Sequence, residues 1–567
     1  MKKLFNTALS ALLALSLAAC GSGESAAGTE SGSSTTAASS EPVATVAATE
    51  GKTEGEKAAG QVDKITVALT NNSFETGPFG KPSGARDWFN TNLYATLYYA
   101  PYFGATIDEL QPWVAKSMTK IDDLTYEFEI RDNVVDSKGN KITTEDIIWS
   151  MEQLAKVAED TTIANNVESM EAIDDTHMRI KLKFLGEGVL EGVIAGYRQG
   201  YVSKSWYESA SDDEKVNNPA TTGPYVITSY TPSAQLVLEA KDDYWLKDDG
   251  SEDFPNGAKQ NVKVINYTCI TEAAMRSIAL ENKEIDVTQV AASELKRFYE
   301  NGAAIGDWNV LINGGNMYSA IFLNMDENST SPLATDENLR KAVLYSINPE
   351  DILFATGANL TTGKVVNSLG TPSMSGYNTA WDDNPAYGYD PAKAKECYEA
   401  SGHKPGEVTV RFLSRTTTGD SVHSVFLAQL QEAGFNVELL DFDQALFNQY
   451  KFDSTQWDII YDSKGASGPI TSGWDNLFNP AGYSNGSVCF THDDKLVELV
   501  QKAFQSGDAA DIEEANTYIN ELALGKGISM SLKFTVGQSG ILELTPTSCF
   551  NPCVNAYVFA ADYKSVK

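Results

Sequence analysis

Apolar and polar residues alternate in short segments along most of the chain after residue 61. Residues 65–69 form a compact apolar run that ends in a polar turn, Thr70-Asn71-Asn72-Ser73. Residues 126–130 and 178–184 alternate strictly between apolar and polar. Successive side chains of a strand point to opposite faces, so these segments are predicted to be strands with one buried face.

Helical signals lie between the strands. Thr143, followed three residues later by Asp146, predicts an N-cap and a helix that continues through Val157. The chain shows no internal repeat of fixed period.

The second half alternates more regularly between the two kinds of segment. Strands are predicted at residues 408–413, 435–440 and 457–461, with helices at 421–433 and 444–450 between them. Strands separated by helices of this length indicate βαβ units and a sheet covered on both faces. The sequence therefore predicts an α/β fold.

Length and composition describe a globular protein of more than one core. The chain has 567 residues, of which 42% are hydrophobic and 10% aromatic. About 500 residues are too many for one core, so at least two lobes are expected. The formal net charge of −34 argues against nucleic acid and against an anionic membrane surface as partners.

The first 60 residues have the pattern of an export signal and a tether. Lys2 and Lys3 precede an apolar stretch at residues 4–17, and small residues lead to Cys20. This order is typical of a secretory signal peptide, and the apolar stretch is short for a membrane span. An ordinary signal peptide followed by an unrelated cysteine is the alternative. Residues 21–60 lack aromatic residues and should form a flexible tether that spans about 35 Å.

The remaining cysteines do not form a disulfide framework. Cys549 and Cys553 are close enough in sequence to bridge within a loop, and the bridge stays an open alternative. Cys269, Cys397 and Cys489 are expected to be buried thiols.

Catalytic and cofactor motifs are absent from the sequence. There is no Gly-x-Ser-x-Gly or His-Glu-x-x-His, and the four histidines are scattered. A loop from Asp326 to Glu337 resembles a calcium loop, but Ser331 stands where glycine is needed. Residues 186–192 are rich in glycine without the spacing of a dinucleotide motif. We expect no enzyme activity, no cofactor and no metal.

A series of short motifs resembles the extracellular solute-binding proteins of family 5, which include dipeptide- and oligopeptide-binding proteins. The motifs occur in the family's order, at residues 110–115, 124–131, 141–147, 218–225, 243–245, 276–286, 338–348 and 389–394. The segment before Cys20, Leu17-Ala18-Ala19, resembles a bacterial lipobox. The resemblance covers nearly the whole chain after the tether.

The resemblance implies a fold, a division of the chain and a location. The fold would be a two-lobed, type II periplasmic-binding-protein-like fold with an extra inserted subdomain. The predicted parts are a lipoprotein signal peptide at 1–19, a lipidated Cys20 and tether at 20–60, a discontinuous first lobe at 61–92, 219–292 and 533–567, an inserted subdomain at 93–218, and a second lobe at 293–532. The protein would be a monomer, anchored by lipid on Cys20 at the extracellular face of the cytoplasmic membrane, or in the periplasmic space if the host has an outer membrane.

The resemblance also implies a ligand and a partner. The ligand would be a small polar molecule, most simply a short peptide, that lies in a cleft between the lobes and is delivered to the permease subunits of an ABC importer. A peptide in a closed cleft needs partners for its charged ends, because an unpaired buried charge is costly.

Arg415 matches the arginine that binds the ligand carboxylate in dipeptide-binding relatives; a solvated loop arginine is the alternative. Asp462 and Asp475 are the carboxylates near the region that binds the ligand amine in relatives. Counted without gaps from the aromatic Tyr461, that position is Lys464, which would favour an acidic group.

Further candidate ligand residues lie at strand ends. Asn71, Asn72 and Ser73 end the first strand, where the polar face of the cleft would form. Tyr318 and Trp457 would offer stacking surfaces, with a role in the core as the alternative.

Two other functions of the same fold stay open. One is oligosaccharide binding, for which the aromatic pairs Tyr98-Tyr99 and Tyr102-Phe103 would suit sugar rings. The other is a surface receptor that senses a peptide without transporting it.

Overall fold

The computed structural model describes residues 61–566, apart from 82–83, 103, 158–161, 252, 467, 480–488 and 547–552. The predicted signal peptide, lipidation site and tether lie outside the described residues, as does Cys549 of the possible disulfide. No helix in the described part is long and apolar enough to cross a membrane.

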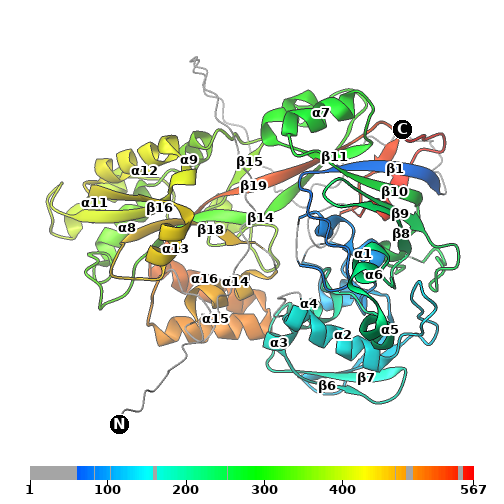
Figure 1. Cartoon of the computed structure of the whole chain (residues 1–567). Helices are drawn as coiled ribbons and strands as arrows, with labels where there is room; N and C mark the ends of the chain where they lie inside the picture. The colour runs from blue at the N-terminus through cyan, green and yellow to red at the C-terminus, as the bar shows by residue number, and fades with distance from the viewer. Residues whose placement is uncertain are drawn as a thin grey trace, which may run out of the picture.

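One eleven-stranded mixed sheet runs through the whole molecule (Figure 1). Its order is β17-β16-β18-β14-β19-β11-β1-β10-β9-β8, with β15 added against β19. The strands of this sheet are β1 (Val62–Leu69), β8 (Tyr225–Thr231), β9 (Gln235–Ala240), β10 (Val262–Cys269), β11 (Val287–Val290), β14 (Asn309–Leu323), β15 (Gly363–Val365), β16 (Thr409–Arg415), β17 (Asn436–Phe442), β18 (Ile459–Gly465) and β19 (Gly525–Gly537).

Two long antiparallel strands, β14 and β19, connect the two halves of this sheet. β14 pairs with β19 from Asn309↔Gly537 to Phe322↔Gly525, and both strands cross the middle of Figure 1. At one end β19 pairs with β11, and at the other end β14 pairs with β18. We call the half that contains β1 and β8–β11 lobe I and the half that contains β16–β18 lobe II.

A bulge interrupts the pairing of β14 with β19, which we call the hinge strands, near its middle. The register shifts between Gly314 and Tyr318. A Cβ atom on Gly315 would lie 2.5 Å from the carbonyl oxygen of Ser531, so only glycine fits at this position. A bulge leaves ladder bonds unmade, so the pairing of β14 and β19 is weakest at this point.

Helices cover both faces of the lobe II sheet. Alternate residues of β18 explain this, because Ile459 and Tyr461 join one core and Ile460 joins the other. The first core contains α8 (Glu337–Ser346), α9 (Pro349–Ala355), α11 (Pro391–Ala400) and α12 (Asp420–Ala433). The second contains α13 (Gln444–Lys451), α14 (Ile470–Phe478), α15 (Asp494–Ser506) and α16 (Ala509–Glu521).

A second body with a sheet of its own lies below lobe I (Figure 1, cyan), and its core also contains Tyr244 and Trp245, which follow β9. Its antiparallel sheet has the order β4-β5-β7-β6. Its elements are β4 (Ala115–Lys120), β5 (Thr125–Ile130), α2 (Thr144–Val157), α3 (Thr162–Asn166), β6 (Val167–Ala172), β7 (His177–Leu182), α4 (Val189–Ala195), α5 (Lys204–Ser209) and α6 (Asp212–Asn217). We call it the inserted subdomain; the exact residue boundaries of the lobes stay a prediction.

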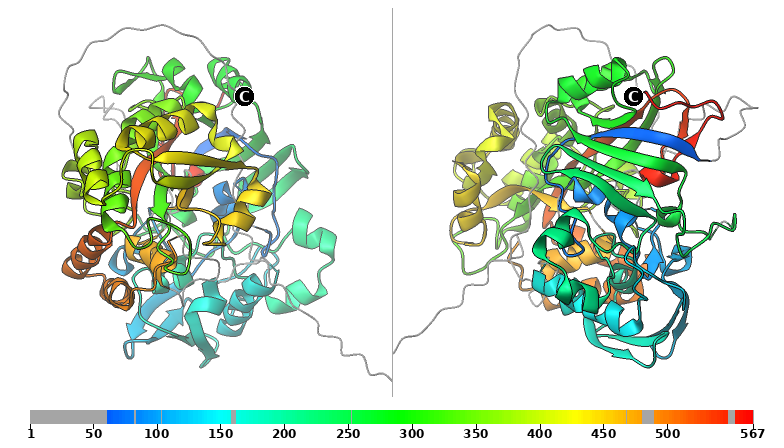
Figure 2. Two further views of the ribbon diagram at one scale, coloured as in Figure 1. Left: turned by 90° about the vertical axis from the view of Figure 1, so that its left-hand side faces the viewer. Right: turned by 45° about the vertical axis from the view of Figure 1, so that its right-hand side comes forward.

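Short elements complete the chain. The remaining helices are α1 (Asn90–Leu93), α7 (Ala273–Glu281) and α10 (Ala380–Asp383). The remaining strands are β2 (Tyr98–Tyr99), β3 (Gln111–Pro112), β12 (Tyr299–Glu300), β13 (Ala303–Ala304), β20 (Ile541–Glu543) and β21 (Val558–Phe559). The views in Figure 2 show that β20 and β21, in red, lie beside lobe I, next to β1.

The predicted elements of the second half are confirmed with small shifts. β16, α12, β17 and α13 overlap the predicted segments, and the predicted strand at 457–461 is β18, which begins at Ile459. The predicted N-cap of α2 is also present: the backbone N–H of Asp146 donates to the hydroxyl oxygen of Thr143 at 3.4 Å, and the backbone N–H and hydroxyl of Thr143 donate to the carboxylate of Asp146 at 3.0 and 2.9 Å.

Asp286 fixes the C-terminal segment to the lobe I sheet. Its fully buried carboxylate accepts hydrogen bonds from the backbone of Thr66, at 2.7 Å, and from the hydroxyls of Tyr563 and Ser565, at 2.6 and 2.8 Å. A buried carboxylate is tolerated when donors of this kind surround it.

Lys526 of β19 generates a prediction about pH and stability. Its buried ammonium donates to the carbonyls of Leu344 and Ile347 at the end of α8, and burial lowers its pKa to about 7. Between this value and the ordinary pKa of 10.5 the unfolded chain holds the proton more tightly, so stability rises with pH in that window. Between pH 7.5 and 9, we expect the free energy of unfolding of wild type to rise relative to that of Lys526→Met by up to about 1.4 kcal/mol per pH unit.

Urea unfolding of both proteins across this pH range measures the difference. Lys395→Met on exposed α11 is the matched control and should follow wild type at every pH. If the difference in free energy of unfolding between wild type and Lys526→Met stayed the same at every pH, the prediction would be contradicted.

Candidate functional site

The parallel strands of the two lobes point their carboxyl ends toward the middle of the hinge strands. β18 pairs with β14 from Ile459↔Leu323 to Gly465↔Met317, and β11 pairs with β19 from Val287↔Gly537 to Val290↔Phe534. β16 is parallel to β18, and β1 is parallel to β11. Ligands in open α/β sheets bind outside the carboxyl ends of strands, so residues after β1, β16 and β18 are placed for binding.

Three cations surround one carboxylate at the ends of β16 and β18. Asp462 accepts from the ammonium groups of Lys464, at 2.8 Å, and Lys451, at 3.3 Å, and from the guanidinium of Arg415. The Asp462 side chain is fully buried, and the three cations are only 17–20% exposed. We call Arg415, Lys451 and Lys464 the basic cluster.

Local structure brings the basic cluster together. α13 is capped by Asp443, whose carboxylate accepts from the backbone of Ala445 and Leu446, and the helix ends at Lys451. Arg415 ends β16, with its guanidinium carbon 4.1 Å from the ring centroid of Phe447. This stacking orients the guanidinium toward Asp462.

The charges of the cluster shift the pKa values of its members. Burial alone would raise the pKa of Asp462, but Lys464, Lys451 and Arg415 together hold it well below its ordinary value. Burial lowers the pKa of Lys451; Asp462 opposes this shift, and Lys464 and Arg415 add to it. Asp462 is therefore ionised at neutral pH, and a ligand ammonium would be a fourth cation around it. Asp462 is better placed to hold the three cations than to bind an amine.

Of the other predicted residues of lobe II, Tyr318 lies next to the basic cluster, because it pairs with Lys464 across β14 and β18. Tyr318 and Trp457 are buried in the core that contains α13 to α16. Tyr461 lies on the opposite face of β18, where its ring centroid is 4.9 Å from that of Phe426. Asp475 lies on α14, accepts from the amide of Asn479 at 2.8 Å, and has its pKa raised by burial.

The predicted residues of lobe I lie in a turn directly after β1. Asn71 is partly buried, and Asn72 and Ser73 are exposed. The backbone N–H of Ser73 donates to the side-chain oxygen of Asn71 at 3.3 Å, which stabilises the turn. These side chains are thus accessible at the carboxyl end of a strand.

A cavity of about 390 Å³ lies between the inserted subdomain and lobe II. One wall consists of α4 and the residues on either side of it, of Thr162 and of residues 100, 102 and 104–106; the other consists of Ser375, Gly468 and Pro469. Binding sites for small molecules usually have about 300–1,000 Å³, so this volume suits a small solute.

Contacts between the two walls close one side of the cavity. The carboxylate of Glu187 accepts from the hydroxyl of Thr471 at 3.0 Å, and its backbone N–H donates to the carbonyl of Phe504 at 2.8 Å. A Cβ on Gly186 would lie 2.4 Å from the ring of Phe504, and one on Gly188 would lie 2.9 Å from Pro469. The glycines that the sequence shows at 186–192 therefore permit a close approach of two chain segments. We call these contacts the clasp.

The charged residues of the cavity wall are mostly acidic. Burial raises the pKa of Glu191, and the nearby Glu187 raises it further. Arg198 is paired with Asp87 through two bonds of 3.1 Å. Tyr102, which also lines the cavity, has its pKa raised to about 12 by burial and by a hydrogen bond to Glu109.

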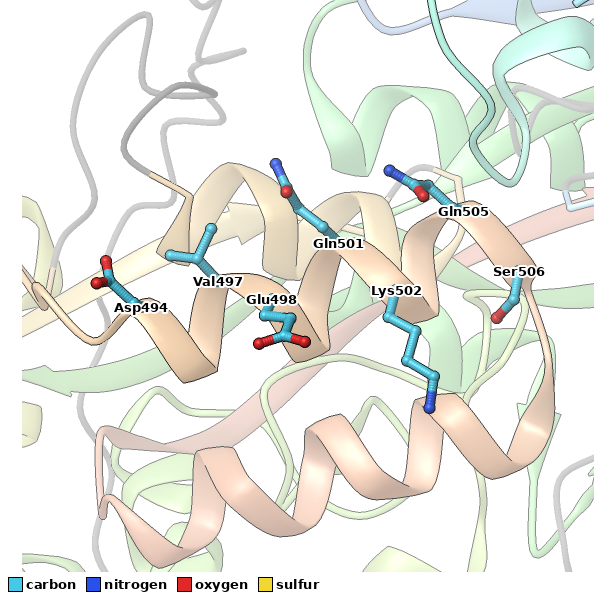
Figure 3. A pocket seen from close by; sticks show the side chains of 7 residues that line it. All are labelled: Asp494, Val497, Glu498, Gln501, Lys502, Gln505 and Ser506. Carbon is cyan, nitrogen blue, oxygen red and sulfur yellow. The ribbon is translucent and has the colours of Figure 1, made fainter.

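A larger hollow of about 620 Å³ lies along α15, but it is not a cleft between lobes. Figure 3 shows that all of its labelled side chains come from one helix. Its lysine, Lys502, turns toward α16 and pairs there with Asp511 at 2.8 Å and Glu514 at 3.0 Å. These surface ion pairs account for the charge of Lys502 without a ligand.

Sequence patterns signalled only part of this site. The sequence does not predict that Lys451 belongs to the cluster, because its position depends on how α13 packs on β16. Glu187 lies in the glycine-rich segment, whose spacing excluded a dinucleotide motif but did not indicate a contact with lobe II. Across the described residues, no group of three His, Cys, Asp or Glu side chains is arranged to hold a metal ion.

The architecture defines a class of protein. Two lobes joined by hinge strands, with a cavity between facing walls, are typical of binding proteins that close around a ligand. Residues 109–485, about two thirds of the chain, match the sequence profile of the bacterial extracellular solute-binding proteins, family 5 (middle region). The chain belongs to this family, which confirms the resemblance found in the motifs.

Two curated relatives illustrate the similarity. The probable D,D-dipeptide-binding periplasmic protein DdpA of Escherichia coli K12 is 24% identical over 332 residues, which are 56% of this chain and 58% of the relative. The oligopeptide-binding protein OppA of Bacillus subtilis 168 is 22% identical over 454 residues, 72% of this chain and 74% of the relative. The match to DdpA thus spans little more than half of that protein.

Solved structures confirm the predicted fold. HbpA2 of Haemophilus parasuis has a TM-score of 0.74 at 16% identity, covering 88% of this chain and 100% of the other. A putative peptide-binding protein, AppA of Clostridium difficile, has a TM-score of 0.71 at 17% identity with the same coverage. At these identities the likeness shows the two-lobed α/β fold alone.

The Asp462 cluster generates a prediction about stability. Asp462→Asn leaves three partly buried cations around a neutral amide, which should lower the free energy of unfolding by about 3–5 kcal/mol. Adding Lys464→Met to this variant should recover part of the loss, because one uncompensated cation is removed.

Urea unfolding at neutral pH measures both changes. Asp441→Asn, at an exposed position on the neighbouring β17, is the matched control and should cost less than about 1 kcal/mol. A loss of the same size in Asp441→Asn and Asp462→Asn would contradict the account of the cluster.

Proposed function

We propose that this protein captures a short peptide, or a polar solute of similar size, between its lobes and delivers it to an ABC importer. The observation that carries the proposal is the cavity with one wall from the inserted subdomain and the other from lobe II. A ligand that touches both walls favours the closed arrangement, because it binds that arrangement more tightly than the open one. Binding and release would follow bending at the β14–β19 bulge, without catalysis.

Several features support a peptide as the ligand. Arg415 would bind the ligand carboxylate from the end of β16, and the turn at Asn71, Asn72 and Ser73 would face it from lobe I. The curated relatives DdpA and OppA carry peptide-binding names. The acidic wall near Glu187 and Glu191 suits an ammonium group at the other end of a peptide. The protein would act as a monomer, with the permease subunits of the importer as its protein partner.

Oligosaccharide binding is a weaker proposal. Tyr98 and Tyr99 are buried in the core of the inserted subdomain and do not offer an open surface to a sugar ring. Tyr102 lines the cavity, while Phe103 lies outside the described residues. A receptor that senses the same ligand without transport would have the same site. Only the presence of importer subunits would distinguish transport from sensing.

A substitution that fills the cavity tests the proposal. Ser375→Trp places a large ring in the wall that faces α4, so peptide binding should weaken at least about tenfold, a loss of about 1.4 kcal/mol. Isothermal titration calorimetry with mixed di-, tri- and tetrapeptides, and separately with oligosaccharides, measures the affinities.

Lys395→Trp introduces the same ring on the exposed face of α11 and should bind like wild type. Two results would count against the proposal: tight binding of oligosaccharides in place of peptides, or equal peptide affinities of Ser375→Trp and wild type.

We also propose that Cys20 carries the lipid that anchors the protein outside the cytoplasmic membrane, with residues 21–60 as its tether. In wild-type cells the mature chain should begin at Cys20, carry the mass of a diacylglycerol group and sediment with membranes. Cys20→Ser should lose the lipid mass and the membrane association while keeping its ligand affinity. An unmodified Cys20 in the intact mass spectrum of the wild-type protein would exclude the anchor.

A further inference from the structure

The basic cluster contains more positive charge than its own carboxylate compensates. Arg415, Lys451 and Lys464 all pair with Asp462, and no other carboxylate of the described residues pairs with any of them. Among the described residues, the cluster therefore has two more positive charges than negative ones.

A purely structural role explains only part of this arrangement. Asp462 Oδ1 accepts from Arg415 and from the backbone of Ser463, and Oδ2 accepts from Lys464 and Lys451. Both oxygens are thus fully used, although each ammonium group has three donors. Buried charges are normally paired, and two uncompensated cations cost stability. Composition does not explain them, because the chain as a whole has a net charge of −34.

The cluster lies where a ligand can complete it. It is formed at the carboxyl ends of β16 and β18, next to the hinge strands. Gly468 of the cavity wall follows Lys464 by only four residues, so their Cα atoms are at most about 14 Å apart. A peptide of three or four extended residues covers this distance.

We infer that the basic cluster binds a ligand group with two negative charges, and that the preferred ligands are peptides whose C-terminal residue is Asp or Glu. Such a residue has two carboxylates close together, which match the two uncompensated cations. Arg415 offers a planar pair of donors to one carboxylate, and Lys451 and Lys464 offer ammonium donors to the other. Asp462 is the positioning residue that holds the three cations in place. That the ligand is a peptide rests on the proposed function. That it carries two negative charges rests on the cluster alone.

A matched series of tripeptides tests the inference by calorimetry. Ala-Ala-Glu should bind wild type at least about tenfold more tightly than the isosteric Ala-Ala-Gln. In the double variant Lys451→Met, Lys464→Met this preference should disappear, so that Ala-Ala-Glu and Ala-Ala-Gln bind the variant with equal affinity. The preference should also shrink at high salt, because screening weakens charge pairing at a partly exposed site.

Two further variants keep the test independent of folding. Lys464→Met alone retains the Arg415–Asp462 and Lys451–Asp462 pairs, and it should lose a large part of the preference. Lys395→Met, on the exposed face of α11, should behave like wild type. Thermal unfolding of each variant shows that it is folded before titration.

The outcomes separate the inference from the proposed function. Equal affinities of wild type for Ala-Ala-Glu and Ala-Ala-Gln would overturn the inference and leave peptide capture intact. If no peptide binds, the proposed function fails, and titration with glutarate decides the inference. Glutarate binding that is lost in the double variant would support the doubly charged site, and no glutarate binding to wild type would overturn it.

Discussion

The pairing of β14 with β19 is the interaction on which the rest of the structure depends. These strands are shared by both halves of the sheet, so their register places β11 and β1 at one end and β18 and β16 at the other. The bulge at Gly314 and Gly315 leaves this pairing incomplete near its middle, where bending costs few hydrogen bonds. In the structure the segment before α4 lies against the start of α14, where the clasp forms. In the proposed function the same strands would hold the two halves together and allow the site to open.

Charge gives the site its chemical character. An acidic protein with a net charge of −34 places three cations around one buried carboxylate at the strand ends of lobe II. The cavity between the inserted subdomain and lobe II is lined by Glu187 and Glu191. A ligand with an acidic end and an amine would find partners at both places. Asp462 connects stability with binding in this account, because the same carboxylate that allows the cations to be buried also orients them.

Local patterns in the sequence predicted the elements that depend on local physics. β16, α12, β17, α13 and β18 follow from periodicity and caps. Arg415 was placed after a predicted strand, and Asp462 was named because of the resemblance to family 5. Their pairing with each other was not predictable, since it depends on the packing of α13, which also supplies Lys451. The cavity was not predictable for the same reason: its walls come from segments about 270 residues apart, near α4 and near Gly468. Trp457 and Tyr318 illustrate the converse, because their aromatic character fits a stacking surface and a core equally well, and only tertiary packing places them in the core.

Native mass spectrometry of the protein, purified without unfolding, tests the central claim that the cavity between the lobes holds a small ligand. The account predicts a bound mass of a few hundred daltons that fragments as short peptides and is released by mild unfolding. Loss of this mass in a cavity-filling variant would place the ligand between the lobes. A wild-type protein with no bound mass, and with no shift in unfolding temperature on addition of peptides or other small solutes, would contradict the account.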